Sequence, residues 1–82
     1  MPRIVGRFRK ARLDYQSRLG RPVTVEEVAE HVAISRQSMS DIENNRRLPR
    51  YGTLAKLCQL YALQPGDLLQ YEDRRALRLA AA

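Results

Sequence analysis

The segment VEEVAEHVAISRQSMSDIEN, residues 25–44, contains two short helix patterns separated by a two-residue turn. Thr24 precedes the first pattern and Ser35 precedes the second. Each hydroxyl side chain is suited to accept a hydrogen bond from the first turn of a helix. A turn this short forces a steep angle between the two helices. The segment therefore predicts crossed helices over residues 25–32 and 36–43.

The sequence on either side predicts three more helices. Apolar residues at helical spacing mark a first helix over residues 3–18, and they are Ile4, Phe8, Ala11 and Tyr15. A second stripe marks a helix over residues 51–62 and comprises Leu54, Leu57, Cys58 and Tyr61. Pro65 favours a helix start and predicts a last helix over residues 65–71, which can run on toward Leu79. The expected fold class is all-α, with five helices.

The composition limits what such a fold can contain. The chain has 82 residues, enough for one small domain. Its single cysteine, Cys58, cannot form an internal disulfide, and one cysteine with one histidine, His31, cannot supply the four ligands of a structural zinc site. A core of this size is weak on its own, so dimerisation is the expected additional source of stability.

The charge of the chain points to a polyanionic partner. Residues 1–50 hold 11 Lys and Arg against 6 Asp and Glu, whereas residues 51–82 hold 4 against 3. A basic half of this kind suits nucleic acid or an anionic membrane. No apolar stretch is long enough to span a membrane and no signal peptide is present, so we expect a cytoplasmic protein without membrane association. With no catalytic constellation and no phosphate-binding glycine loop, we expect neither an enzyme nor a cofactor.

The helix that begins at Arg36 is the candidate for reading DNA. Its first turn carries Arg36 and Gln37, whose side chains can pair with guanine and adenine edges. The candidate base-reading residues are Arg36, Gln37, Ser40 and Asp41. The candidate contacts to the DNA backbone are Ser35, Ser38, Asn44, Asn45, Arg46, Arg47 and Arg50. Asp41 has two readings: it either accepts from cytosine, or pairs with Arg36 or Arg46 and orients them.

Residues 23–69, VTVEEVAEHVAISRQSMSDIENNRRLPRYGTLAKLCQLYALQPGDLL, resemble the lambda-repressor-like (Xre/Cro-type) DNA-binding domain, and residues 4–12 look like its first helix. The positions that match are Thr24, Ala29, Ser35, Ile42, Glu43, Asn44, Pro49, Thr53 and Leu54. The resemblance implies a five-helix fold, with a helix-turn-helix at the second and third helices, that binds an operator as a homodimer. It also implies base contacts from Arg36, Gln37 and Asp41, and backbone contacts from Ser38, Asn44 and Arg46.

The sequence departs from this family at four places. Val25 stands where glutamine is common, which removes a contact, and Arg50 is a poor helix cap where serine is common. Ala33 stands where glycine is favoured, at a cost of roughly 1 kcal/mol if the turn needs a positive φ. Residues 13–22 form a longer link than usual, which either lengthens the first helix or makes a basic loop containing Arg18 and Arg21.

We read residues 1–82 as a single helix-turn-helix domain in which residues 70–82 are a C-terminal extension. Apolar residues in and beside that extension predict a dimer surface made by Leu69, Tyr71 and Leu77. The expected function is that of a sequence-specific transcriptional regulator, a repressor, bound to double-stranded DNA. Two alternatives remain: an antitoxin-type protein that binds a partner toxin and represses its own operon, and a nonspecific nucleic-acid binder.

Overall fold

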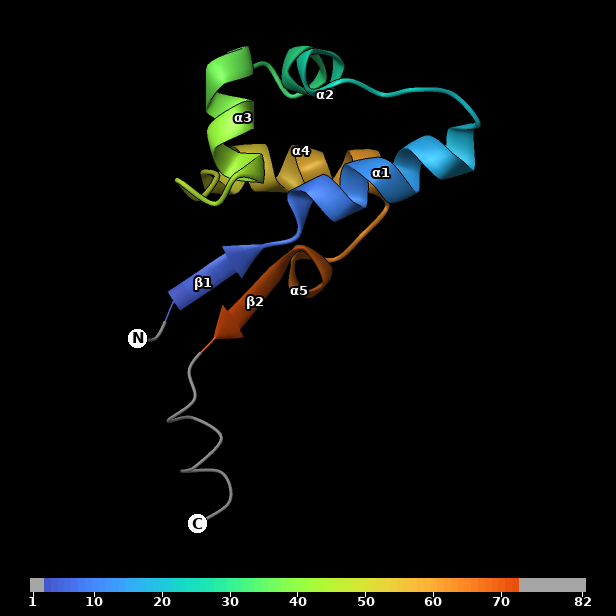
Figure 1. Cartoon of the computed structure of the whole chain (residues 1–82). Coiled ribbons are helices and arrows are strands. Elements are labelled where there is room, and N and C mark those ends of the chain that lie inside the picture. Colours follow the sequence, from blue (N-terminus) through green and yellow to red (C-terminus); the bar gives the residue numbers. More distant parts are fainter. Residues whose placement is uncertain (1–2, 73–82) are drawn as a thin grey trace.

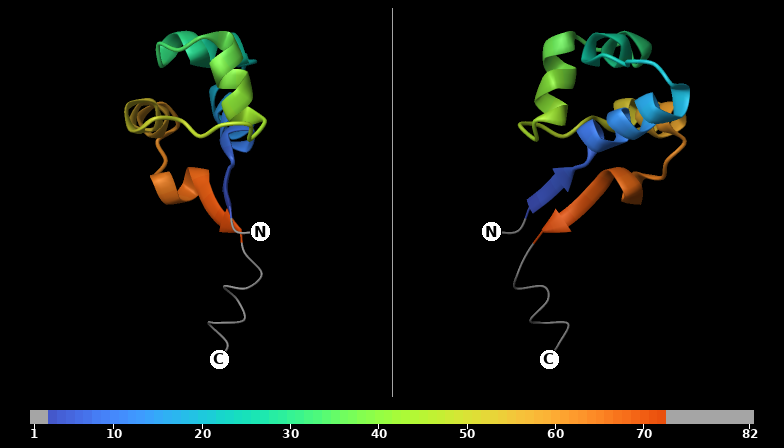
Figure 2. Two further views of the ribbon diagram at one scale, coloured as in Figure 1. Left: turned by 90° about the vertical axis from the view of Figure 1, so that its left-hand side faces the viewer. Right: turned by 45° about the vertical axis from the view of Figure 1, so that its right-hand side comes forward.

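The computed structural model describes residues 3–72. These residues form five helices and two strands, arranged in three tiers (Figure 1). The elements in chain order are β1 (Arg3–Gly6), α1 (Phe8–Leu19), α2 (Val25–His31), α3 (Arg36–Glu43), α4 (Tyr51–Tyr61), α5 (Pro65–Leu68) and β2 (Leu69–Glu72). Helices α2 and α3 lie on one side of the layer formed by α1 and α4, and the strands with α5 lie on the other, as the two further views also show (Figure 2).

Local sequence patterns correctly predicted the positions of the three central helices. The predicted ranges 25–32, 36–43 and 51–62 agree with α2, α3 and α4 to within one residue. Thr24 Oγ1 accepts a hydrogen bond of 3.1 Å from the Glu27 amide, and Ser35 Oγ accepts one of 3.1 Å from the amide of Ser38. The Glu27 carboxylate binds Arg21 at 2.9 Å, and this hydrogen bond lowers the pKa of Glu27.

The all-α prediction is wrong at both ends of the described chain. Strand β1 pairs antiparallel with β2, from Arg3 opposite Glu72 to Gly6 opposite Leu69. Residue Ile4 therefore lies in a strand, and the first helix begins at Phe8 rather than at residue 3. The predicted helix over 65–71 ends at Leu68, because the chain turns there into β2. Its expected continuation toward Leu79 lies outside the described residues.

The long link predicted at residues 13–22 lengthens the first helix. Helix α1 continues to Leu19 and ends at Gly20, whose φ of 71° lies in the left-handed region. The guanidinium of Arg18 donates a 2.7 Å hydrogen bond to the carbonyl of Tyr61 and lies 5.6 Å from the ring centre of Tyr15. The end of α1 is thus tied to the end of α4.

The core fills the space between α1, α4 and the crossed pair α2 and α3. Its buried apolar residues are Phe8, Ala11, Val23, Val28, Ala29, Val32, Met39, Ile42, Leu57, Tyr61 and Leu68. Cys58 is half-buried against this core, and burial raises the pKa of its thiol. His31 is exposed, as expected for its place on α2. Within residues 3–72, no helix has both the length and the apolar character needed to cross a membrane.

Candidate nucleic-acid interface

The turn between α2 and α3 brings the two helices together at a small residue. Ala29 is buried at 2% exposure, and its carbonyl accepts a 3.0 Å hydrogen bond from the amide of Ile34. Ala33 adopts a φ of 60° in this turn, so the conformational cost expected for alanine there is present. The turn leaves the outer face of α3 uncovered within the described part of the molecule, because Met39 and Ile42 turn the inner face into the core.

The first turn of α3 presents two of the four predicted base-reading side chains to solvent. Arg36 and Gln37 are exposed. The Nε of Arg36 lies 3.3 Å from an oxygen of Glu26, but the two side chains are 73% and 67% exposed. An ion pair this exposed contributes little free energy and yields readily to a competing partner.

Asp41 lies at the centre of a small polar network. Its carboxylate accepts a 3.0 Å hydrogen bond from Gln37 Nε2 and lies 3.5 Å from a guanidinium nitrogen of Arg46. Arg36 pairs with Glu26 instead. Of the two readings of Asp41, the free protein therefore displays the orienting one, with Arg46 and Gln37 as the oriented groups. Ser40 accepts a weak 3.4 Å hydrogen bond from Asn44 Nδ2.

The segment between α3 and α4, residues 44–50, is named here the arginine loop. Its three arginines, Arg46, Arg47 and Arg50, are all exposed. Its two asparagines are also exposed, and each is bound to the N-terminal part of the described chain: Asn44 Oδ1 accepts from Arg9 at 2.6 Å, and Asn45 Oδ1 accepts from the amide of Gly6 at 2.6 Å. The loop thus combines three exposed arginines with two asparagines that tie it to β1 and α1.

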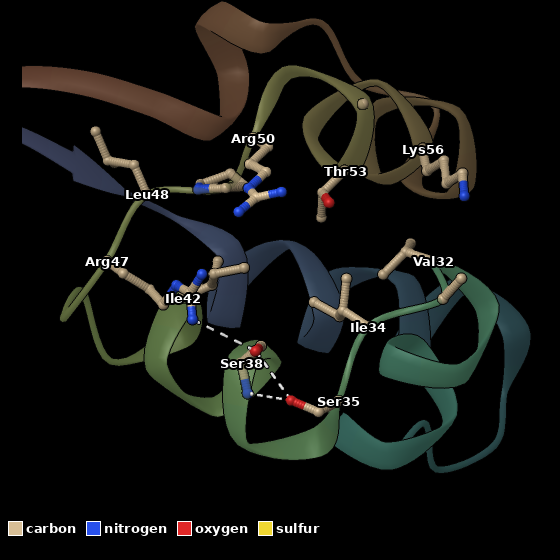
Figure 3. A pocket seen from close by; sticks show the side chains of 13 residues that line it. Val32, Ile34, Ser35, Ser38, Ile42, Arg47, Leu48, Arg50, Thr53 and Lys56 are labelled. Carbon is tan, nitrogen blue, oxygen red and sulfur yellow. Dashed lines mark hydrogen bonds between the residues drawn. The ribbon is translucent and has the colours of Figure 1, made fainter.

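A cavity of about 570 Å³ opens between the α2–α3 turn, the arginine loop and the start of α4 (Figure 3). Arg47, Arg50 and Lys56 line it with no acidic side chain among the described residues that form its wall. Hydroxyl groups from three residues add hydrogen-bonding capacity, namely Ser35, Ser38 and Thr53. One of them, Ser38, accepts from Arg47 at 3.4 Å. This lining suits a phosphate group.

Lys56 and Thr53 are site residues that the sequence reasoning missed. A signal for them was present, because Arg50, Thr53 and Lys56 recur every three residues and so share one face of α4. No side-chain hydrogen bond caps α4 at Arg50 within the described structure, as expected for arginine at this position. The first amide groups of α4 add a partial positive charge beside the cavity.

A buried ion pair fixes the far end of α3. Arg12 Nε lies 2.8 Å from Glu43 Oε2, and the side chains are only 15% and 2% exposed. The same guanidinium donates a 2.8 Å hydrogen bond to the carbonyl of Val23, just before α2. Arg12 therefore does not lie on a solvated face of α1. Arg12 follows Phe8 by four residues, as Glu43 follows Met39, so both lie on apolar stripes.

The predicted dimer surface is described only in part. Leu69 is half-buried and lines an apolar pocket of about 390 Å³ together with Leu48, Tyr51 and Leu54. Tyr51 is 92% exposed at the mouth of that pocket, and Tyr71 is 53% exposed on β2. Leu77 lies outside the described residues. The exposed apolar surface near α4 is therefore broader than the sequence suggested.

Comparison with known proteins gives one family. A family model described as a helix-turn-helix domain matches residues 6–71, a range that includes the five helices of the described residues. No curated protein and no solved structure matches the chain. The family match is consistent with the resemblance to lambda-repressor-like domains, and it indicates DNA binding. The chain belongs to the family of helix-turn-helix domains.

Proposed function

We propose that this protein is a sequence-specific transcriptional regulator, a repressor, that binds a two-fold operator as a homodimer. The observation that carries the proposal is the combination of the exposed first turn of α3 with a cationic loop and a cavity beside that helix. Helices α2 and α3 are the helix-turn-helix of this proposal. In such motifs the second helix enters the major groove with its first turn against the base edges.

Arg36 and Gln37 read the operator in this proposal. Arginine pairs bidentately with guanine, and glutamine does so with adenine. Binding exchanges the exposed contact between Arg36 and Glu26 for a contact with DNA. In the free protein Asp41 contacts both Gln37 and Arg46, so it orients these side chains and belongs to the same base-reading surface.

The cavity and the arginine loop bind the DNA backbone. Arg47, Arg50 and Lys56 supply positive charge, and the hydroxyl groups of Ser38 and Thr53 supply hydrogen bonds. Contacts of this kind set the position of a protein on the duplex without reading sequence. They also release counterions, so the affinity falls as the salt concentration rises.

The homodimer follows from the geometry of operators. Two copies related by a two-fold axis present two α3 helices to half-sites about one helical turn apart. The exposed side chains of Leu48 and Tyr51, which line one pocket with the half-buried Leu69, support an association between copies. Repression is the simpler regulatory role, because a bound dimer blocks a promoter with no surface other than its DNA-binding face. The proposal involves neither an enzymatic activity nor a cofactor.

The same apolar surface supports an alternative partner. A toxin-like protein docked at Tyr51 would make this chain an antitoxin that also represses its own operon. Co-purification of a protein encoded next to it would favour that reading. A monodisperse homodimer without such a partner would favour the first proposal.

Selection of bound fragments from a random DNA pool tests the proposal. We expect a two-fold motif with half-sites about 10 base pairs apart. On that motif, Arg36→Ala or Gln37→Ala should cost roughly 1–3 kcal/mol and relax the preference at one base position. Arg46→Ala is the matched comparison and should weaken binding to all sequences alike. If random DNA displaces the selected fragment at equal concentration, the protein is a nonspecific binder and the proposal fails.

A further inference from the structure

Asn45 joins the arginine loop to the strand at the other end of the domain. Its backbone φ is 59°, which lies in the left-handed region, where asparagine is one of the better tolerated residues. Its Oδ1 accepts a 2.6 Å hydrogen bond from the Gly6 amide, and its Nδ2 donates a 3.3 Å hydrogen bond to the Gly6 carbonyl. One side-chain amide thus satisfies both backbone polar groups of one residue.

The register of the sheet explains why the backbone of Gly6 can form hydrogen bonds with the Asn45 side chain. The Arg7 amide donates a 2.8 Å hydrogen bond to the Leu68 carbonyl, one step beyond the pair Gly6 and Leu69. Hydrogen-bonded and non-hydrogen-bonded pairs alternate along an antiparallel ladder. Arg7 is therefore directed toward the partner strand, and the polar groups of Gly6 are directed away from it. The Asn45 amide occupies the place of a further strand at this edge.

Glycine at position 6 is required for this approach. A Cβ at Gly6 would overlap the Phe8 ring, and Phe8 is 1% exposed in the core. The same Cβ would lie 3.3 Å from Asn45 Oδ1. A second contact holds the loop nearby, because Arg9 donates to Asn44 Oδ1 at 2.6 Å. Both asparagines at the start of the arginine loop are thus bound to the N-terminal part of the described chain.

We propose that Asn45 is a positioning residue for DNA binding and not a contact to the DNA backbone. By fixing the loop to β1, it holds Arg46 and Arg47 in place for the phosphates. This inference rests on the proposed function and replaces the sequence-based role of Asn45. It follows that the position of the arginine loop depends on the two-stranded sheet.

The variant Asn45→Gly tests the inference, because glycine keeps the positive φ and removes both side-chain hydrogen bonds. Ala62→Gly is the matched control, since Ala62 also has a positive φ, of 57°, but lies at the end of α4. We expect Asn45→Gly to weaken binding to selected and random DNA equally, by about three- to tenfold. Ala62→Gly should leave the affinity unchanged.

A double-mutant cycle separates positioning from direct contact. If Asn45 acts through the arginines, Asn45→Gly should change affinity less than about twofold when Arg46 and Arg47 are already alanine. An unchanged loss in that background would mean that Asn45 itself contacts DNA, and the inference would be overturned.

Amide hydrogen exchange in the absence of DNA gives a readout that does not depend on the proposed function. In Asn45→Gly the amides of Gly6 and Arg46, which are hydrogen-bonded to Asn45 Oδ1 and to the Asp41 carbonyl, should exchange faster, while the Arg7 amide keeps its protection. Unaltered exchange at Gly6 and in the loop would refute the positioning role even for a protein that binds no DNA. Altered exchange in a protein that binds no specific DNA would refute the proposed function and leave the anchor standing.

Discussion

At the scale of single residues, Tyr61 combines complete burial with an unpartnered hydroxyl. Its exposure is 0%, and among residues 3–72 the hydroxyl has no hydrogen-bond partner. A buried polar group without a partner costs about 1–3 kcal/mol. We expect Tyr61→Phe to raise the free energy of unfolding at neutral pH by about 1 kcal/mol, as measured by urea denaturation. The ring itself stays in its edge-on contact with Tyr15, at 5.6 Å between centres.

The controls for Tyr61→Phe are a second tyrosine and a second pH. Tyr51→Phe removes a hydroxyl from a side chain that is 92% exposed and should leave stability unchanged. Burial raises the pKa of Tyr61, so the wild-type fold loses stability as the pH rises above the ordinary tyrosine pKa of 10.0. Tyr61→Phe should lose less between pH 9 and pH 11. A variant less stable than wild type at pH 7 would show that the hydroxyl has a favourable role.

Ala33 stores conformational strain in the turn between α2 and α3. Its φ of 60° costs an alanine roughly 1–2 kcal/mol, whereas glycine is free of that cost. Glycine also makes the unfolded chain more flexible, which offsets part of the gain. We expect Ala33→Gly to raise the free energy of unfolding by about 0.5–1 kcal/mol, and the melting temperature with it.

Ala55→Gly is the matched control for this turn. Ala55 is exposed on α4, where a helical conformation makes glycine unfavourable by about 1 kcal/mol. The same chemical change should therefore stabilise the protein at one site and destabilise it at the other. Destabilisation at both sites would mean that the Ala33 methyl group makes a contact worth more than the strain.

At the scale of elements, the Arg12–Glu43 pair sets how α3 lies on α1. The guanidinium contacts the end of α3 through Glu43 and the entry to α2 through the Val23 carbonyl. Removing one member of a buried ion pair leaves a buried charge and costs about 3–5 kcal/mol. We expect Arg12→Met to lower the free energy of unfolding by that amount, as measured by thermal and urea denaturation.

Two comparisons separate burial from charge in this prediction. Arg12→Met combined with Glu43→Leu removes both charges and should recover most of the stability. Arg21→Met breaks an ion pair with Glu27 whose side chains are 56% and 45% exposed, so little change is expected. Equal losses for Arg12→Met and Arg21→Met would contradict the special role of the buried pair.

The elements also show how far sequence could predict this structure. Helices α2 and α3 were predictable because Thr24 and Ser35 cap them through contacts three residues away. Strands β1 and β2 were not, because each has four residues and pairs with a partner at the other end of the domain. Ile4 precedes Phe8 by four residues, and that spacing falsely extended the first helix. Long-range pairing leaves no such local pattern.

The residues of the candidate site were likewise predictable only in part. The exposure of Arg36 and Gln37 followed from their place in the first turn of α3. The hydrogen bonds of Asn45 could not be predicted in this way, because its partner Gly6 lies 39 residues away in the chain. Side chains with an exposed place on one element were predictable, whereas those that connect two distant elements required the folded chain.

At the scale of the whole molecule, the two-stranded sheet joins the first and last described elements and so closes the domain. The ladder predicts different costs for proline at neighbouring positions of β1. Val5 has the same parity as Arg7, so its amide is directed toward β2, whereas the Ile4 amide is directed outward, like that of Gly6. Proline removes an amide hydrogen, and it is tolerated in a strand only where that hydrogen is outside the ladder.

We therefore expect Val5→Pro to lower the free energy of unfolding by at least about 1 kcal/mol, because it removes a hydrogen bond of the ladder. Ile4→Pro, one residue away on the same strand, should cost clearly less. If the sheet is part of the cooperative unit, Val5→Pro should lower the melting temperature seen by helical circular dichroism and by tyrosine fluorescence together. If the transition in tyrosine fluorescence shifts while the helical circular dichroism melts as in wild type, the sheet folds separately from the helical core. In that case the anchor between Gly6 and Asn45 could not transmit the order of the core to the arginine loop.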